Sequence, residues 1–144
     1  MNLFINSPAY YSQNHGVVDE IYKMCRDISE EINVMDYTSS LETIGIIPIL
    51  APKELMEQNQ WLGHVKISIP YKMAVVSLNS SYEHFCAETL DQKMEIILNN
   101  ILESLQLIKK KLKGKFHYED MEKAILEIGK RHIELQRFRM ANGK

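Results

Sequence analysis

Apolar residues recur at the helical period from residue 90 to residue 112, and this stretch constrains the fold more than any other part of the chain. They lie one, three or four positions apart: Leu90, Met94, Ile97, Leu98, Ile101, Leu102, Leu105, Ile108 and Leu112. Thr89 and Gln92 form a capping box at its start, and Gly114 is a natural stop. The pattern predicts a long helix lying across a sheet, with its apolar stripe at the centre of the core.

Two further helices are predicted, one near each end of the chain. The first spans about residues 15–35, is capped by Asn14 and carries apolar residues at helical spacing. The last spans about residues 118–138, and Gly129 inside it costs about 1 kcal/mol relative to alanine. One side of this last helix carries Tyr118, Met121, Ile125, Ile128, His132 and Leu135. Either this helix leaves an exposed stripe that supports a homodimer, or Tyr118, Met121, Ile125 and Ile128 complete the core.

Strand patterns account for most of the remaining chain. Residues 3–5 are typical of a short first strand, and residues 43–50 of a buried strand in which Pro48 places part at an edge or bulge. Residues 64–71 alternate between apolar and polar, with Val65, Ile67, Ile69 and Tyr71 on one side. Since another strand follows over residues 73–78, we expect a hairpin that turns near residues 70–72.

Together these elements predict the fold class α+β. We expect a mostly antiparallel sheet of about four strands, packed on one face by the long amphipathic helix plus an N-terminal and a C-terminal helix. At 144 residues the chain is long enough for a single core, so residues 1–144 are expected to form one domain. Residues 139–144 are expected to be a frayed tail.

The sequence contains no pattern typical of a catalytic, metal or cofactor site. The histidines His15, His64, His84, His117 and His132 are scattered, and no CxxC motif or glycine-rich phosphate loop is present. Cys25 and Cys86 fit buried thiols better than a disulfide. We therefore expect a protein that is not an enzyme and that uses no cofactor.

No membrane-directed segment is expected. The first residues lack the basic start of a signal peptide, and the longest apolar run, residues 44–51, is far shorter than the roughly 20 residues of a spanning helix. The sequence thus predicts a cytoplasmic protein without a membrane partner.

Charge is distributed unevenly along the chain. Residues 1–108 contain 14 Asp and Glu against 6 Lys and Arg, a net charge of −8. Residues 109–144 contain 11 Lys and Arg against 5 Asp and Glu, a net charge of +6. An acidic body with a basic end indicates a surface that meets a charged partner.

The basic end begins with a dense cluster of lysines: Lys109, Lys110, Lys111, Lys113 and Lys115. Such a cluster can bind phosphates, which makes a nucleic-acid-binding accessory protein the alternative function. The competing explanation is that cations at a helix C-terminus offset the helix dipole. We favour this second explanation, since the cluster lacks arginine and aromatic residues and nucleic acid is an unlikely partner for an acidic body.

The acidic residues of the body suggest a different partner. Glu30, Glu31 and Asp36 close the first helix, and Glu83, Glu88, Asp91 and Glu95 line the start of the long helix. Solvation alone explains most of them. As an interface, an acidic surface speeds association with a basic partner.

One longer pattern starts at Tyr82. It contains the segment Tyr82–Phe85, then Ala87, then a helix that carries residues 100–105 and 108–112, then Phe116 and a helix over residues 120–126. In these features the chain resembles immunity protein family 44 of bacterial immunity proteins. The opening residues 1–5 and the strand at residues 46–49 fit the same layout more loosely, and the basic extension from Gly129 to Lys144 departs from it.

The resemblance implies an antidote that binds the C-terminal domain of a polymorphic or contact-dependent toxin and blocks it. Many such toxins are nucleases, whose basic clefts suit an acidic partner. We therefore predict a non-catalytic toxin inhibitor that acts by occlusion. The predicted contact residues are Glu83, Glu88, Asp91, Glu95 and Trp61, although Trp61 is equally consistent with a core position. A small enzyme of an unrecognised kind is a further alternative, which a deep pocket with converging polar groups would favour.

Overall fold

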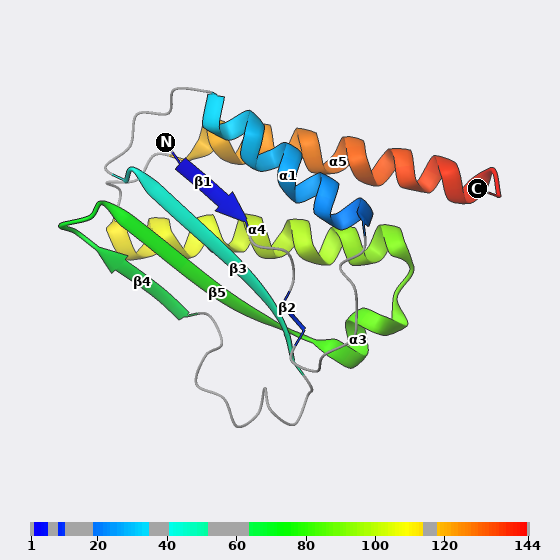
Figure 1. Cartoon of the computed structure of the whole chain (residues 1–144), viewed down its shortest axis with the longest axis horizontal. Coiled ribbons are helices and arrows are strands. Elements are labelled where there is room, and N and C mark those ends of the chain that lie inside the picture. The colour runs from blue at the N-terminus through cyan, green and yellow to red at the C-terminus, as the bar shows by residue number, and fades with distance from the viewer. Residues whose placement is uncertain are drawn as a thin grey trace.

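The computed structural model describes residues 2–5, 9–10, 19–34, 41–51, 64–113 and 118–143, and it arranges them in layers (Figure 1). Helices α1 (Asp19–Val34) and α4 (Leu90–Leu112) cover one face of a β-sheet. Helix α5 (Glu119–Ala141) packs on both of these helices, and the short helix α3 (Tyr82–Ala87) joins the sheet to α4. The α+β class and the helical cover on one face agree with the prediction.

The sheet is mixed. Its strand order is β1 (Asn2–Ile5), β3 (Thr43–Ala51), β5 (Met73–Ser81) and β4 (His64–Ser68), and the two-residue strand β2 (Ala9–Tyr10) also pairs with β3. Strands β1, β2 and β5 run parallel to β3, whereas β4 pairs antiparallel with β5. The prediction of a mostly antiparallel sheet is therefore wrong for the described strands.

Connectivity explains the parallel pairing. A crossover through α1 returns the chain to the end of the sheet at which β1 began, so β3 starts beside β1 and runs the same way. The predicted hairpin is present as β4 and β5, and the turn is closed by the backbone N–H of Lys72, which donates to the carbonyl of Ile69 (3.2 Å). The second strand of that hairpin, and not the first, lies next to β3. Strand patterns locate strands but do not identify their neighbours.

Two local expectations for the strands need correction. Pro48 lies on β3, which is an interior strand, and not at an edge. The stretch of β3 that pairs with β1 ends at Ile46, and the stretch that pairs with β2 begins at Ile49, so Pro48 lies between them. β4 ends at Ser68, so Ile69 and Tyr71 lie in the turn, where their side chains are 82% and 74% exposed.

The helices largely follow their predicted bounds. α4 spans the predicted residues, and its capping box is present, with the backbone N–H of Thr89 donating to Oε1 of Gln92 (3.0 Å). The helix ends at Leu112, and its C-cap residue Lys113 takes the left-handed conformation (φ 48°) and donates its N–H to the carbonyl of Lys109. Asn14 and Gly114, the predicted cap and stop, lie outside the described residues. α5 continues three residues past 138, to Ala141.

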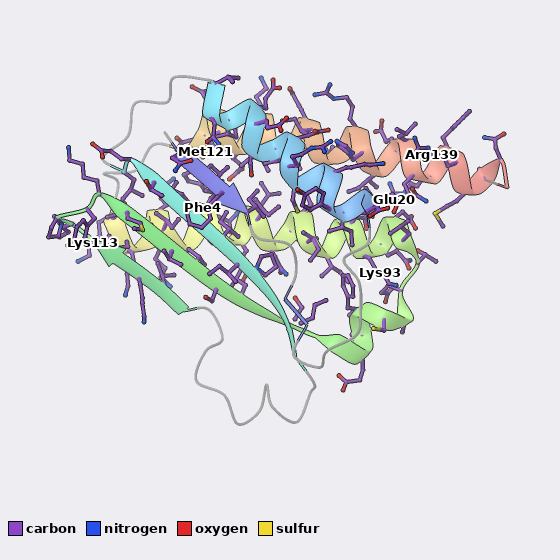
Figure 2. The ribbon with its side chains drawn as sticks, viewed as in Figure 1. Phe4, Glu20, Lys93, Lys113, Met121 and Arg139 are labelled. Atoms are coloured by element: carbon purple, nitrogen blue, oxygen red, sulfur yellow. The ribbon has the colours of Figure 1, made fainter. Side chains whose placement is uncertain are left out.

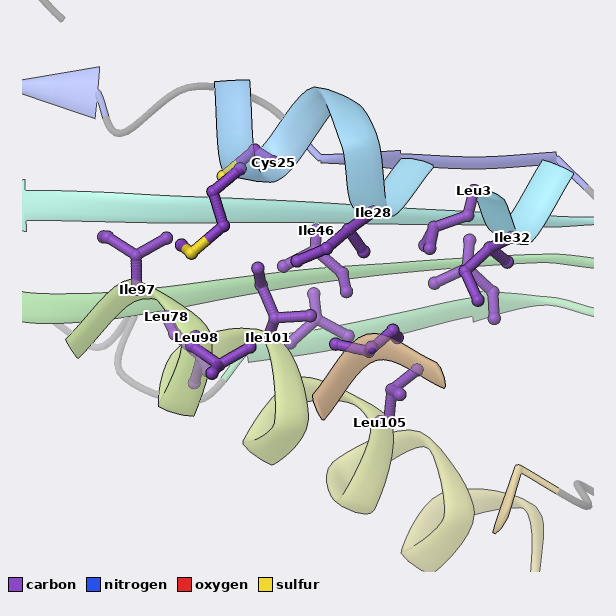
Figure 3. Packing of buried hydrophobic residues seen from close by; sticks show 14 of the residues in the cluster. Leu3, Cys25, Ile28, Ile32, Ile46, Leu78, Ile97, Leu98, Ile101 and Leu105 are labelled. Atoms are coloured by element: carbon purple, nitrogen blue, oxygen red, sulfur yellow. The ribbon is translucent and has the colours of Figure 1, made fainter. Parts of the chain in front are cut away.

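The core lies between the sheet and the first helical layer (Figure 3). Ile44, Ile46 and Leu50 of β3 point to the helices and are buried, as are Ala74, Val76 and Leu78 of β5. They meet the apolar stripes of α1 and α4, in which Ile28, Ile32, Ile97, Ile101 and Leu105 are fully covered. Burial of these alternating and helical positions supplies most of the stabilisation of such a fold.

Helix α5 completes this core. Tyr118, Met121, Ile125 and Ile128 are buried, which decides in favour of a core role over an exposed stripe at these four positions. Further along, the buried positions are Ile133 and Gln136, whereas Leu135 is 48% exposed, so the predicted apolar side is shifted in the last turns. Gly129 is buried against Leu98 of α4; a Cβ at this position would lie 2.5 Å from two carbons of that side chain. The missing side chain allows the two helices to approach closely.

Candidate interaction surfaces

The predicted acidic site is divided between α3 and the start of α4. Glu83 is exposed on α3, and Oε1 of Glu88 lies 3.6 Å from Nε2 of His84. Asp91 and Glu95 lie in the first turns of α4. Trp61, the fifth predicted contact residue, lies outside the described residues. The structure thus brings the four carboxylates to one end of α4, and their role in binding a toxin stays a prediction.

Two of these carboxylates are held by the C-terminal helix. The guanidinium of Arg137 donates from Nε to Oδ2 of Asp91 (3.1 Å), and its other arm is bonded to Oε1 of Glu95. The hydrogen bond from the Thr89 hydroxyl (2.6 Å) lowers the pKa of Asp91 most, Arg137 lowers it further, and partial burial opposes both. The same two carboxylates raise the pKa of Arg137. The basic extension therefore supplies a clamp that ties α5 to the start of α4.

The lysine cluster lies at the other end of α4, as Figure 2 shows with Lys113 and Lys93 at opposite ends of the helix. Nζ of Lys109 lies 3.5 Å from Oε1 of Glu119 and 5.2 Å from the ring centroid of Tyr118. Lys110, Lys111 and Lys113 are exposed, and Lys115 lies outside the described residues. Lys109 binds α5 and three lysines lie in or just after the last turn of α4, an arrangement that fits the dipole explanation better than phosphate binding.

A third feature, a pocket between α1 and α5, was not predicted. Its volume is about 320 Å³, and its lining consists of Asp27, Glu30, Glu31, Val34, Ile128 and Arg131. Beside it, Nε2 of His132 lies 2.8 Å from Oδ2 of Asp27, which joins the two helices. Helical periodicity places Glu30 and Glu31 at the end of α1, but no local pattern places Arg131, about 100 positions later in the chain, beside them. A signal for this surface is present in the sequence, since no basic residue lies in the last turn of α1 to offset Glu30 and Glu31.

Features that would indicate catalysis are few. In the described part of the chain, no group of three or more His, Cys, Asp or Glu side chains is placed to hold a metal ion. Both cysteines are free, as expected; burial raises the pKa of the Cys25 thiol to about 12, which makes it unreactive. Cys86 is exposed, contrary to the expectation that both thiols are buried. None of the described helices has the length and apolar character needed to cross a membrane.

Comparison with known families identifies the family of the chain. A sequence model described as immunity protein 44 matches residues 1–131, which is most of the chain. The chain belongs to the immunity protein 44 family. This membership confirms the resemblance found in the sequence, and it extends the match from the region after Tyr82 to the N-terminal strand. No curated protein and no solved structure matches the chain significantly.

The family match covers the pocket of this immunity protein family member completely but its arginine clamp only in part. The whole lining of the α1–α5 pocket falls within residues 1–131, with Arg131 as the last matched residue. Arg137 lies beyond the match, together with the exposed side chains of Leu135 and Phe138. The clamp on Asp91 and Glu95 is thus contributed from outside the family match, which is consistent with the departure from the family pattern seen in the sequence.

Proposed function

We propose that this protein is the antidote to a bacterial toxin domain, which it binds and blocks by occlusion without catalysing a reaction. The observation that carries the proposal is the family match over residues 1–131. The proposed place of action is the cytoplasm, where the antidote would meet the toxin domain before it acts.

The charge distribution supports a basic target. Residues 1–108 carry a net charge of −8, and complementary charge both speeds association and disfavours wrong partners. A nuclease domain is the target class we favour, because an active site that binds phosphates is lined by cations. Glu83 and Glu88 remain proposed contacts at the acidic start of α4, where Glu88 lies 3.6 Å from His84.

The test is co-expression with the C-terminal domain of the large protein encoded immediately upstream. Survival of the host together with co-purification of a stable complex is the expected result. Death of the host and no complex, with both proteins folded, would contradict the proposal for that pair. A filter-binding assay with DNA and RNA addresses the alternative, and salt-dependent affinity that is lost on replacing Lys110 and Lys111 would favour it.

A further inference from the structure

The pocket between α1 and α5 combines apolar and acidic walls. Ile128 is 5% exposed and contributes apolar surface from α5, while Val34 at the end of α1 is 82% exposed. Asp27, Glu30 and Glu31 line the same pocket from α1. At about 320 Å³ it is in the lower part of the range in which proteins bind small groups. In Figure 1 the two helices lie side by side, with α1 next to strand β1 of the sheet.

The carboxylates of this pocket differ in their partners. Asp27 is occupied, since it contacts Nε2 of His132 at 2.8 Å and Nε of Arg26 at 3.7 Å. Within the described part of the chain, Glu30 and Glu31 take part in none of the ion pairs or side-chain hydrogen bonds of the fold. Arg131 also lines the pocket, again without an ion pair to a described carboxylate. The pocket therefore holds an excess of negative charge, three carboxylates against one guanidinium.

The position of these carboxylates is unfavourable for α1 itself. Glu30 and Glu31 lie close to its C-terminus, where the helix dipole is negative, and no basic residue occupies the last turn. Local rules of this kind are broken most often where a residue serves binding and not folding. Among the described residues neither Glu30 nor Glu31 forms an ion pair, and Arg131 alone brings a positive charge to the pocket lining, so a partner that brings a cation would find both carboxylates available.

We infer that this pocket receives a basic side chain, an arginine in the first place, from the surface of the toxin domain; the inference rests on the proposed function. The guanidinium would lie between Glu30 and Glu31, because a planar fork of donors matches carboxylates in two-point contact. The alkyl stem would pack on Val34 and Ile128, as long basic side chains do on apolar surface. A metal ion is a poorer occupant, since the carboxylates do not form a group of three placed to hold one.

The test uses single charge reversals in the full chain against the upstream toxin domain, with affinity measured by calorimetry or interferometry. Glu30→Lys and Glu31→Lys should each weaken binding by at least about tenfold, and Glu31→Gln should weaken it less. Glu103→Lys is the matched control, since Glu103 is exposed on α4 away from the pocket, and it should change affinity by less than about twofold. The thermal midpoint of the reversed variants should be unchanged or raised, which excludes unfolding as the cause.

The outcomes separate the two proposals. If the wild-type protein rescues the host and binds the toxin domain, and the pocket variants bind equally well, the pocket inference is overturned while the proposed function stands. If the wild-type protein neither rescues nor binds, both fail. Hydrogen exchange supplies an independent readout: residues 27–34 and 128–131 should gain protection in the complex. Concentration-dependent dimerisation of the isolated protein that Glu31→Lys abolishes would assign the pocket to a second copy and overturn the inference.

Discussion

Asp91 and Glu95 lie at the positive end of α4, whereas Glu30 and Glu31 lie near the negative end of α1. The first pair is bound by Arg137, and its helix has a capping box. Neither member of the second pair forms an ion pair with a described residue. The carboxylates of Asp91 and Glu95 thus serve the fold, whereas those of Glu30 and Glu31 remain available to a partner.

The comparison also shows why counting acidic residues is a poor guide to an interface. The start of α4 is the contact surface that the sequence predicts, because Glu83, Glu88, Asp91 and Glu95 line it. Part of its charge is offset by an arginine that lies 46 and 42 residues further along the chain. What matters for a partner is the charge left after the fold has paired its own groups.

The largest effect is expected from Ile101→Asp, because both acidic regions rest on the same core. Ile101 is fully buried, and an unpaired carboxylate there should destabilise the protein by more than about 4 kcal/mol and unfold it. Circular dichroism and chemical denaturation would measure this, with Ile101→Val, expected to cost about 1 kcal/mol, as the control. A folded Ile101→Asp protein that retains toxin binding would show that α4 is not the centre of the core.

A smaller effect is expected from Gly129→Ala, which acts on the helix that borders both regions. The added methyl group would meet Leu98 at 2.5 Å, and overpacking costs about 1–3 kcal/mol against a gain of about 1 kcal/mol in helix propensity. The net result should be destabilisation, measured by urea denaturation. In a Leu98→Ala background, where room has been made, the same substitution should be neutral or stabilising. Stabilisation in both backgrounds would mean that Leu98 moves aside without cost.

Charge reversal is expected to change stability in opposite directions in the two acidic regions. Glu31→Lys replaces an unfavourable charge near a helix C-terminus and should stabilise the protein by about 0.3–1 kcal/mol at low salt. Asp91→Lys should destabilise it, because it loses the helix dipole, the Thr89 hydroxyl and Arg137 together. Thermal unfolding at low and high salt measures both, and screening should reduce both differences. Shifts of the same sign would remove the distinction between the two regions.

The smallest effect concerns pH. The pKa of Asp91 is lowered in the folded protein, chiefly by the hydrogen bond from Thr89 and further by Arg137. The stabilisation from its charged form is therefore fully present above the unfolded pKa of about 3.9 and is lost as the pH falls through the folded pKa. The difference in thermal midpoint between the wild type and Asp91→Asn should be constant near neutral pH and should shrink below about pH 4. A difference that grows on acidification would contradict this assignment.

Much of the secondary structure was predictable, because it is written in short-range patterns. The period of apolar residues located α4 and the body of α1, and the alternation around residues 64–78 located the hairpin. The shift of the buried side of α5 from Leu135 to Ile133 and Gln136 was not predictable from that helix alone, since it depends on the packing of α5 against α1 and α4.

The residue pattern is enough to locate most helices and strands, the capping of α4 and the division of charge, and to place the chain in its family. The parallel direction of β1 and β5 relative to β3, the binding of Asp91 and Glu95 by Arg137, and the pocket between α5 and the acidic end of α1 depend on tertiary packing. The physical reason is range. Helix and strand propensities act over a few residues, whereas the contact of His132 with Asp27 joins positions 105 residues apart and exists only once the helices have packed.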